Sequence, residues 1–277
     1  MRTLQLLSGQ TIPVLGMGTW RMGENARNRQ TEIDALRHGL DLGLSLIDTA
    51  EMYGEGGAEE VIAQAIATRR SQVFLVSKVY PHNASKRGAI TACERSLKRL
   101  QTDYLDLYLL HWRGSVPLAE TLDAFQTLQQ AGKIRSYGVS NFDTEDMKEA
   151  THLSGGNAIV TNQVLYNLMR RGIELNLLPW CRQRGIPIMA YSPIEQGRLL
   201  NNWTLEAIAQ ERGVTTAQVA IAWLLHQENV IVIPKSSRTE HVEQNYAALD
   251  LKLSPEELAT LNAAFPLPTK PVSLEML

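Results

Sequence analysis

The sequence is poor in cysteine, and this shortage excludes one class of protein. Among 277 residues there are only two cysteines, Cys93 and Cys181, far apart and without a CxxC motif. Neither a disulfide framework nor a cysteine-ligated metal site is therefore expected. The two thiols are predicted to be buried structural residues.

Long apolar runs and an excess of one charge are also missing. No run approaches the roughly 20 apolar residues of a membrane span, and the first 13 residues, MRTLQLLSGQTIP, lack the apolar core of a signal peptide. The 27 basic and 29 acidic residues give a formal charge of −2 and no continuous basic surface for nucleic acid. We expect a cytoplasmic monomer that binds neither membrane nor nucleic acid.

Two familiar ligand motifs are absent as well. No histidine pair has the HExxH or comparable spacing of a zinc site, so we expect no metal. The stretch LGMGTWRMG begins like a dinucleotide-binding G-x-G-x-x-G, but Arg21 stands at the third glycine position. No helical pattern opens there, and a loop at the end of a strand is the better interpretation.

Apolar, β-branched runs recur about every 30 residues and alternate with helical patterns. The expected strands begin near Val14, Leu46, Val73, Leu105, Ile134, Ile159, Pro187 and Val230. Eight strand–helix units without a linker-like segment predict an α/β fold, a single (β/α)8 TIM-barrel domain over residues 1–277.

Turn and capping residues mark where these elements begin and end. Ser85 and Thr144 are predicted helix N-caps, and Gly43, Gly132 and Gly185 are predicted helix stops.

Both ends of the chain carry additional elements. The turn Ser8-Gly9-Gln10 between two short apolar runs predicts an N-terminal hairpin. The long interval before the last strand contains two helical patterns, at residues 204–212 and 216–227. Ser254-Pro255-Glu256-Glu257 is typical of a helix start, so we expect an extra C-terminal helix to about Phe265, followed by a surface loop.

Four polar residues stand at or just after the ends of expected strands. Asp48, Lys78 and His111 each end a strand, and Tyr53 follows Asp48 in the next loop. The carboxyl ends of parallel strands meet on one face, so these side chains should converge. We expect Lys78 to lower the pKa of Tyr53, Asp48 to keep Lys78 charged, and neutral His111 to donate a hydrogen bond to a carbonyl.

This set, with the motif DTAEMYG, resembles the Asp-Tyr-Lys-His tetrad of the aldo-keto reductases. AGKIRSYGVSNF at 131–142 and IPKSSRTEHVEQN at 233–245 agree, so the resemblance covers essentially the whole chain. It implies a (β/α)8 barrel whose N-terminal hairpin plugs the bottom, and carbonyl reduction with a nicotinamide cofactor. Within the family, the sequence is most similar to bacterial reductases of methylglyoxal and other small aldehydes.

The resemblance also assigns residues to the nicotinamide. It implies that Ser140, Asn141 and Gln163 hold the carboxamide and that Tyr191 stacks on the ring. Without it, hydroxyls and amides at these positions could equally cap helices, and Tyr191 could be an ordinary aromatic of the barrel rim.

IPKSSRTEH predicts an anion site for the cofactor phosphates. Lys235, Ser236, Ser237 and Arg238 precede a helix expected to begin near Thr239. Two cations, two hydroxyls and the backbone amides of a helix start favour an anion, and barrels often bind phosphate here. A solvated charged turn is the alternative.

The next residues depart from the family pattern. His241 stands where many NADPH-using members carry an arginine on the adenosine phosphate, and Gln244 replaces an acid that contacts adenine, whereas Asn245 fits. Imidazole binds a phosphate less well than guanidinium does. Because Lys235 and Arg238 can compensate, NADPH is the expected cofactor, with NADH as the second choice.

Three aromatic residues in strand-end loops, Trp20, Tyr80 and Trp112, are expected to line a small apolar substrate pocket together with Met22. The predicted function is NADPH-dependent reduction of small aldehydes and ketones, such as methylglyoxal, to alcohols, with Tyr53 as general acid. A cofactor-sensing regulatory subunit, like the potassium-channel β-subunits of this fold, and a Schiff-base aldolase acting through Lys78 are the alternatives.

Overall fold

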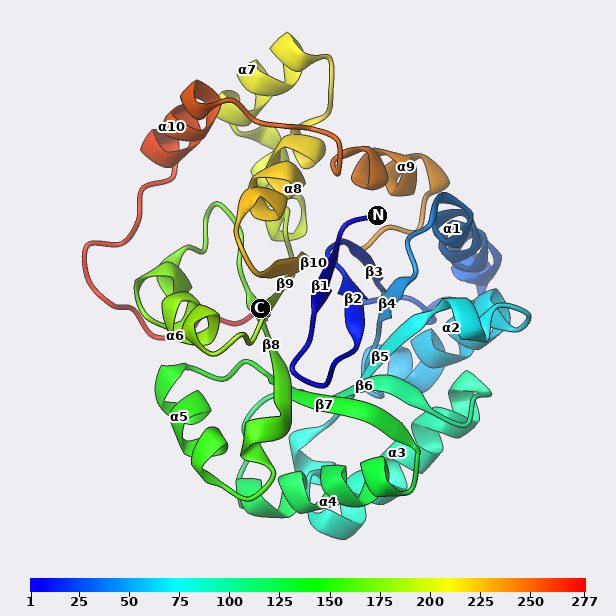
Figure 1. Ribbon diagram of the computed structural model, residues 1–277. Coiled ribbons are helices and arrows are strands. Elements are labelled where there is room, and N and C mark those ends of the chain that lie inside the picture. The colour runs from blue at the N-terminus through cyan, green and yellow to red at the C-terminus, as the bar shows by residue number, and fades with distance from the viewer.

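The computed structural model describes all 277 residues and contains a closed parallel barrel. Eight strands are hydrogen-bonded in the order β10-β9-β8-β7-β6-β5-β4-β3. Parallel bridges from Leu15 to Val232 and from Gly18 to Lys235 join the two outer strands and close the ring (Figure 1). The strands are β3 Gly16–Gly18, β4 Leu46–Asp48, β5 Phe74–Val79, β6 Leu105–Leu110, β7 Ile134–Ser140, β8 Ile159–Leu165, β9 Ile188–Tyr191 and β10 Val230–Val232.

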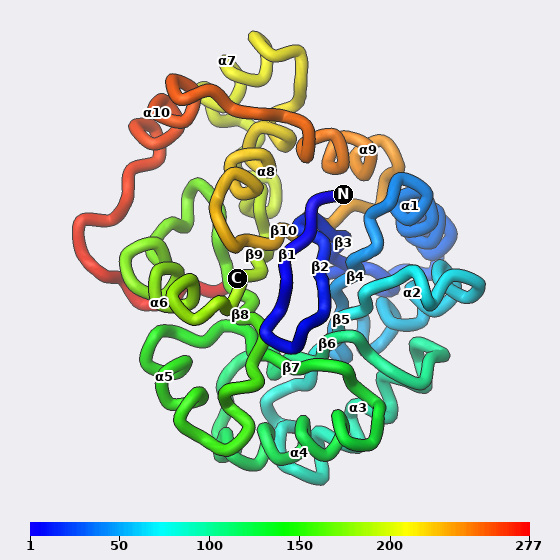
Figure 2. Tube along the Cα trace, viewed as in Figure 1, coloured from blue at the N-terminus to red at the C-terminus, as the bar shows by residue number.

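Helices form an outer layer around the strands, as the ribbon and the tube both show (Figures 1 and 2). They are α1 Arg29–Leu42, α2 Gly57–Ile66, α3 Lys86–Leu100, α4 Leu118–Gln130, α5 Thr144–His152, α6 Leu177–Gln183, α7 Trp203–Arg212, α8 Thr216–His226, α9 Thr239–Ala247 and α10 Pro255–Ala264. No helix combines the length and the apolar character needed to cross a membrane. The predicted (β/α)8 architecture is confirmed.

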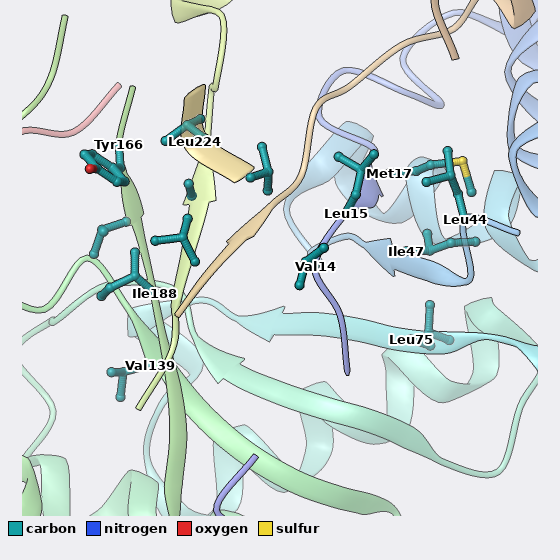
Figure 3. Close-up of a cluster of buried hydrophobic side chains, with 14 of the residues drawn as sticks. Val14, Leu15, Met17, Leu44, Ile47, Leu75, Val139, Tyr166, Ile188 and Leu224 are labelled. Atoms are coloured by element: carbon teal, nitrogen blue, oxygen red, sulfur yellow. The ribbon is translucent and has the colours of Figure 1, made fainter. Parts of the chain in front are cut away.

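Alternate residues of each strand enter two different cores. Ile47, Leu75 and Val139 belong to a cluster of 65 buried residues that includes the inner faces of the helices (Figure 3). Their neighbours Leu46 and Val76 belong to a second cluster of 11 residues, which fills the barrel. Side chains alternate along a strand. The parity of β5 therefore directs Lys78 into the barrel at the carboxyl end of the strand.

The N-terminal hairpin closes one end of the barrel, as predicted. β1 Thr3–Gln5 pairs with β2 Thr11–Pro13 and lies across the centre of the ring (Figure 2). Gly9 adopts φ +83° in the turn, a left-handed conformation that suits glycine. Leu6 and Ile12 are 2% and 0% exposed and join the cluster inside the barrel. The opposite, carboxyl end of the strands is left for ligands.

Most of the predicted helix boundaries are confirmed, and one is wrong. Ser85 and Ser254 cap α3 and α10. Thr144, however, is the first residue of α5 rather than its cap. Asp143 is the N-cap, and it forms a reciprocal capping box with Asp146. The carboxylate of Asp143 accepts from the amide of Asp146 at 2.8 Å, a bond that Thr144, one residue further on, does not make.

The segment after α10 is a loop, as expected, but it is anchored at both ends. Arg171 donates to the side chain of Asn262 at 2.9 Å and to the carbonyl of Phe265 at 2.7 Å. Near the other end of the loop, Glu275 pairs with Arg170. The loop residues 272–275 line one side of a cavity of about 120 Å³ next to α5 and α6.

Candidate active site

Asp48, Lys78 and Tyr53 meet at the carboxyl ends of β4 and β5. The ammonium of Lys78 donates to Oδ2 of Asp48 at 2.8 Å, to the carbonyl of Thr49 at 2.7 Å and to Oη of Tyr53 at 3.4 Å. Lys78 is 0% and Asp48 2% exposed. An ammonium has three donors, and here each of them has an acceptor. The lysine is therefore held in one orientation with its charge directed at the acid and the phenol.

The pKa of Tyr53 is shifted in the direction opposite to the one expected from the sequence. Burial, and then the charge of Asp48, raise the pKa of this phenol well above its usual range. Lys78 was expected to lower it, but its ammonium is nearer to Asp48 than to Tyr53, and the carboxylate offsets its charge. The phenol therefore stays protonated at neutral pH.

Lys78 itself experiences opposing effects. Burial lowers the pKa of Lys78, and the charge and hydrogen bond of Asp48 raise it, as does the more distant charge of Glu59. Burial is the largest of these effects. The acid beside Lys78 thus works against the desolvation that favours the neutral amine.

His111 completes the group and is neutral. Burial, with a smaller contribution from Lys78, lowers the pKa of His111 to about 2. Its Nδ1 is buried without a hydrogen-bond partner. An N–H at Nδ1 would be buried and unsatisfied, which costs free energy, so we assign the ring proton to Nε2. The ring centroids of Tyr53 and His111 lie 5.8 Å apart, edge to face.

A second acid lies behind Lys78, and the sequence analysis missed it. Glu59 of α2 is 0% exposed, accepts from Oγ of Ser77 at 2.7 Å and pairs with Arg99 at 2.6 Å. Arg99 also packs on Gly56, where a Cβ would lie 2.5 Å from its Cδ. The Glu59–Arg99 ion pair therefore stabilises the turn that follows Tyr53. The available signal was the spacing of Glu59 to buried Ile62 and Ile66 on one helix face.

Glu51 is another residue that the sequence analysis missed. Its carboxylate accepts from the backbone amide of Tyr80 at 2.8 Å and from the side chain of Asn83 at 3.0 Å. Glu51 is 9% exposed and follows Asp48 by three residues. It therefore ties the loop after β4 to the loop after β5, a contact that depends on the closed barrel rather than on local sequence.

Three of the residues assigned to the nicotinamide form one polar chain beside His111. The hydroxyl of Tyr191 donates to the side-chain oxygen of Asn141 at 3.0 Å, and the amide nitrogen of Asn141 donates to the carbonyl of His111 at 3.1 Å. Oγ of Ser140 donates to the backbone carbonyl of Gln163 at 2.8 Å. Asn141 has φ +57°, a strained conformation that occurs at functional sites.

The end of the chain also reaches this group. Burial raises the pKa of Tyr191, and the backbone amide of Leu277, near the Tyr191 hydroxyl, partly opposes that shift. The last residues therefore lie at the barrel mouth, which the sequence did not predict.

The segment expected to bind phosphates combines a cationic turn with an uncapped helix. Nζ of Lys235 donates to Oγ of Ser237 at 2.8 Å, and Oγ of Ser236 accepts from the amide of Arg238 at 3.0 Å. The start of α9 at Thr239 has no side-chain cap. Its first amides are available to an anion.

Other residues of this segment lie on α9 or face it. His241 is exposed and Asn245 is 8% exposed. Burial lowers the pKa of Lys235. The charges of Glu32 and Glu24 oppose this shift, and the charge of Arg21 adds to it. Arg21 was not identified as a site residue. It lies in a strand-end loop with φ +63°, and its guanidinium carbon lies 4.4 Å from the centroid of the Trp20 ring.

Two of the three expected pocket aromatics surround His111. The ring of Trp112 lies 4.8 Å from that of His111 and 5.5 Å from that of Tyr80. Trp20 is 36% exposed, and its ring is covered by Arg21 rather than by the other two aromatics. Met22 is 0% exposed within the larger core cluster, so its expected place in the pocket wall is wrong.

The fold and the site together define a (β/α)8-barrel protein with a proton-handling group at the carboxyl ends of its strands. The chain belongs to the aldo/keto reductase family, whose model matches residues 14–265.

Individual relatives are similar over nearly the whole length. Methylglyoxal reductase YeaE of Escherichia coli (strain K12) is 52% identical over 280 residues, covering 99% of both chains. Glyoxal reductase of Bacillus subtilis (strain 168) is 34% identical, covering 94% of this chain and 92% of its own. A crystal structure of an aldo/keto reductase from Klebsiella pneumoniae in complex with NADP and acetate has a TM-score of 0.97 and 52% identity, covering 99% of both chains.

Proposed function

We propose that this chain catalyses the NADPH-dependent reduction of small aldehydes and ketones, such as methylglyoxal, to alcohols. The observation that carries the proposal is the buried ammonium of Lys78, shared between Asp48 and the phenol of Tyr53 beside neutral His111. Relatives that reduce methylglyoxal and glyoxal, and a similar structure in complex with NADP, support the substrate class and the cofactor.

The residues at the barrel mouth fit a dinucleotide. Asn141 and Ser140 present an amide and a hydroxyl beside His111, and Tyr191 presents a ring next to them. The uncapped start of α9, with Lys235 and Ser237, fits a phosphate. A bound reduced nicotinamide supplies the hydride that the carbonyl carbon accepts.

Tyr53 and His111 handle the substrate oxygen in this proposal. Nε2–H of His111 donates to the carbonyl oxygen and orients it. The phenol of Tyr53, kept protonated by its raised pKa, transfers its proton to the alkoxide, a stronger base than phenolate. Lys78, 3.4 Å from the phenol oxygen, then stabilises the phenolate electrostatically, and Asp48 holds Lys78 in place.

The geometry disfavours a Schiff-base aldolase. Imine formation needs a neutral amine with an accessible lone pair, but the nitrogen of Lys78 is fully buried and donates to three acceptors. Borohydride should therefore trap no carbonyl substrate on Lys78. The intact arrangement around Tyr53 likewise favours an enzyme over a purely cofactor-sensing subunit.

The direct test is consumption of reduced nicotinamide by the purified chain. NADPH and NADH are compared in parallel against small aldehydes, glyoxals and sugars, with absorbance at the nicotinamide band as the readout. We expect turnover with NADPH and small dicarbonyl substrates. An enzyme that oxidises neither cofactor with any member of the panel would contradict the proposal.

Tyr53→Phe separates chemistry from binding. Removing the phenol oxygen should lower kcat by about 100-fold to 10,000-fold, because the proton donor is lost. The dissociation constant of NADPH, followed by quenching of protein fluorescence, should change little, because the hydroxyl of Tyr53 contacts Lys78 and not the residues that fit the cofactor. Undiminished turnover by this variant would exclude Tyr53 as the acid.

A further inference from the structure

Gln163 of β8 makes a contact that its expected role at the carboxamide does not explain. Its side-chain nitrogen Nε2 donates to Oδ1 of Asp48 at 2.7 Å and lies 2.9 Å from the sulfur of Met189. An ionised carboxylate can only accept hydrogen bonds, so the NH₂ end of the amide must face Asp48. Gln163 is 2% exposed, and this contact joins residues 115 positions apart.

The two oxygens of Asp48 thus have different partners. Lys78 donates to Oδ2 at 2.8 Å, and Gln163 is the side-chain donor on Oδ1. Both bonds are buried. A hydrogen bond to a charged group contributes more than one between neutral groups, and a buried carboxylate oxygen without a donor is costly. Gln163 is therefore part of what fixes the orientation of Asp48 toward Lys78.

The other end of the Gln163 amide has no partner within the chain. No donor within the chain is hydrogen-bonded to its Oε1. This oxygen is not fully buried, so it borders solvent. The backbone carbonyl of Gln163 accepts from the hydroxyl of Ser140 and from the amide of Asn141, each at 2.8 Å. Gln163 is therefore bonded through its backbone to Ser140 and Asn141, the residues that fit a carboxamide.

We propose that Gln163 is a positioning residue that links the cofactor's carboxamide to the proton donor. Its Oε1 accepts from the carboxamide NH₂ while its Nε2 donates to Asp48, and Asp48 in turn holds Lys78 against Tyr53. The successive donor–acceptor distances from Gln163 to Asp48, from Lys78 to Asp48 and from Lys78 to Tyr53 are 2.7, 2.8 and 3.4 Å. The inference rests on the proposed reductase function.

The charged groups around this path come from several elements. Asp48 of β4 is faced by Lys78 of β5 and by Tyr53 of the following turn, while Glu59 of α2 acts on Lys78 from behind. His111 of β6 is neutral above a pKa of about 2. A change at Gln163 that alters the pH profile would thus act through the Asp48–Lys78–Tyr53 contacts rather than through His111.

Gln163→Met and Ser140→Ala separate positioning from simple cofactor binding. Methionine has a similar length but no amide donor, so Gln163→Met removes the bond to Asp48. Ser140→Ala removes a neighbouring hydroxyl that does not touch Asp48. For each variant, kcat is measured from pH 5 to 10 with NADPH and methylglyoxal, and the dissociation constant of NADPH is measured separately. Circular dichroism checks that both variants fold.

If the link exists, Gln163→Met lowers kcat by roughly tenfold to a hundredfold. It also shifts the inflection of the pH profile relative to the wild type, because the Asp48–Lys78–Tyr53 contacts lose the amide that orients Asp48. Ser140→Ala weakens NADPH binding and leaves the inflection in place. The inference is overturned if Gln163→Met also weakens binding alone, with the wild-type inflection unchanged.

The wild-type chain provides a test that needs no substitution. In the 3-acetylpyridine analogue of NADPH, a methyl group replaces the NH₂ that would donate to Gln163. Exchanging the cofactor should lower kcat in the wild type by a larger factor than in Gln163→Met, where the link is already broken. Equal factors in both proteins would overturn the inference.

Failure of the proposed function would look different. In that case the wild type oxidises no NADPH. The pH dependence of NADP⁺ binding then tests whether Gln163 links the carboxamide to Asp48. We then expect the dissociation constant of NADP⁺ to vary with pH in the wild type and to be flatter in Gln163→Met. Identical pH dependence of NADP⁺ binding in the wild type and in Gln163→Met would overturn the inference that the carboxamide is linked to Asp48.

Discussion

Lys78 is charged at a position where burial favours the neutral amine. Desolvation lowers its pKa, while Asp48 at 2.8 Å and the more distant Glu59 raise it. An interior ammonium is tolerated only when it is paired and all its donors are satisfied, and three acceptors meet that condition here. Strand parity could predict from the sequence that Lys78 and Asp48 meet. Burial depends on the whole barrel, so the direction of the Tyr53 shift could not be predicted.

His111 makes a testable contribution to the pH dependence of stability. The folded chain keeps this imidazole neutral down to a pKa of about 2, whereas an unfolded chain protonates it near 6.5. The unfolded state thus binds more protons below that value. The contribution of neutral His111 to the free energy of unfolding is fully present above about pH 6.5. Below that pH, the contribution falls by about 1.4 kcal/mol for each pH unit.

His111→Gln should therefore flatten the pH profile of stability. Urea unfolding of the wild type and the variant at pH 7 and pH 5.5 measures the difference directly. We expect the wild type to lose about 1.4 kcal/mol more than the variant over this interval. The same replacement at His226, an exposed histidine at the end of α8, is the matched control and should leave the slope as it is. Parallel slopes for wild type and His111→Gln would contradict a buried neutral imidazole.

At the scale of elements, strands were easier to predict than helix starts. Apolar β-branched runs predict all eight strands, because a strand buried on both faces needs apolar residues on both. The sequence predicts Thr144 as the N-cap of α5, whereas the N-cap is Asp143 and Thr144 is the first helical residue. Aspartate and threonine are both favoured at N-cap positions. The deciding signal was Asp146, three residues after Asp143, which completes the capping box.

This correction predicts unequal effects for two neighbouring substitutions. Asp143→Ala removes the carboxylate that accepts from the amide of Asp146, and should cost about 1 kcal/mol of unfolding free energy. Thr144→Ala, the matched control, removes a hydroxyl that has no hydrogen-bond partner and should cost less than about 0.5 kcal/mol. Urea denaturation of both variants checks the order. A larger loss for Thr144→Ala would restore the original assignment.

At the scale of the whole molecule, closure of the barrel brings together residues that no local pattern connects. Gln163 meets Asp48 across 115 positions, and Glu51 meets the loop of Tyr80. The repeat of about 30 residues predicts that the strand ends share one face, but not which side chains on that face touch. Such contacts depend on barrel packing and on strand parity near the bulge in β8. The contact of Gln163 with Asp48 and the role of Glu51 were therefore missed, whereas the strand-end residues were found.

The two cysteines can report whether the barrel opens as one unit. Cys93 of α3 and Cys181 of α6 are both 0% exposed and lie on different sides of the ring (Figure 1). Burial raises the pKa of each thiol to about 12, so neither should react with a thiol reagent in the folded state. We expect both to be labelled at the same slow rate in mild urea, because one cooperative unfolding event exposes them together. Mass spectrometry of the two labelled peptides gives the separate rates. Faster labelling of Cys181 would show that the seven-residue α6 opens on its own, independently of the α3 side of the barrel.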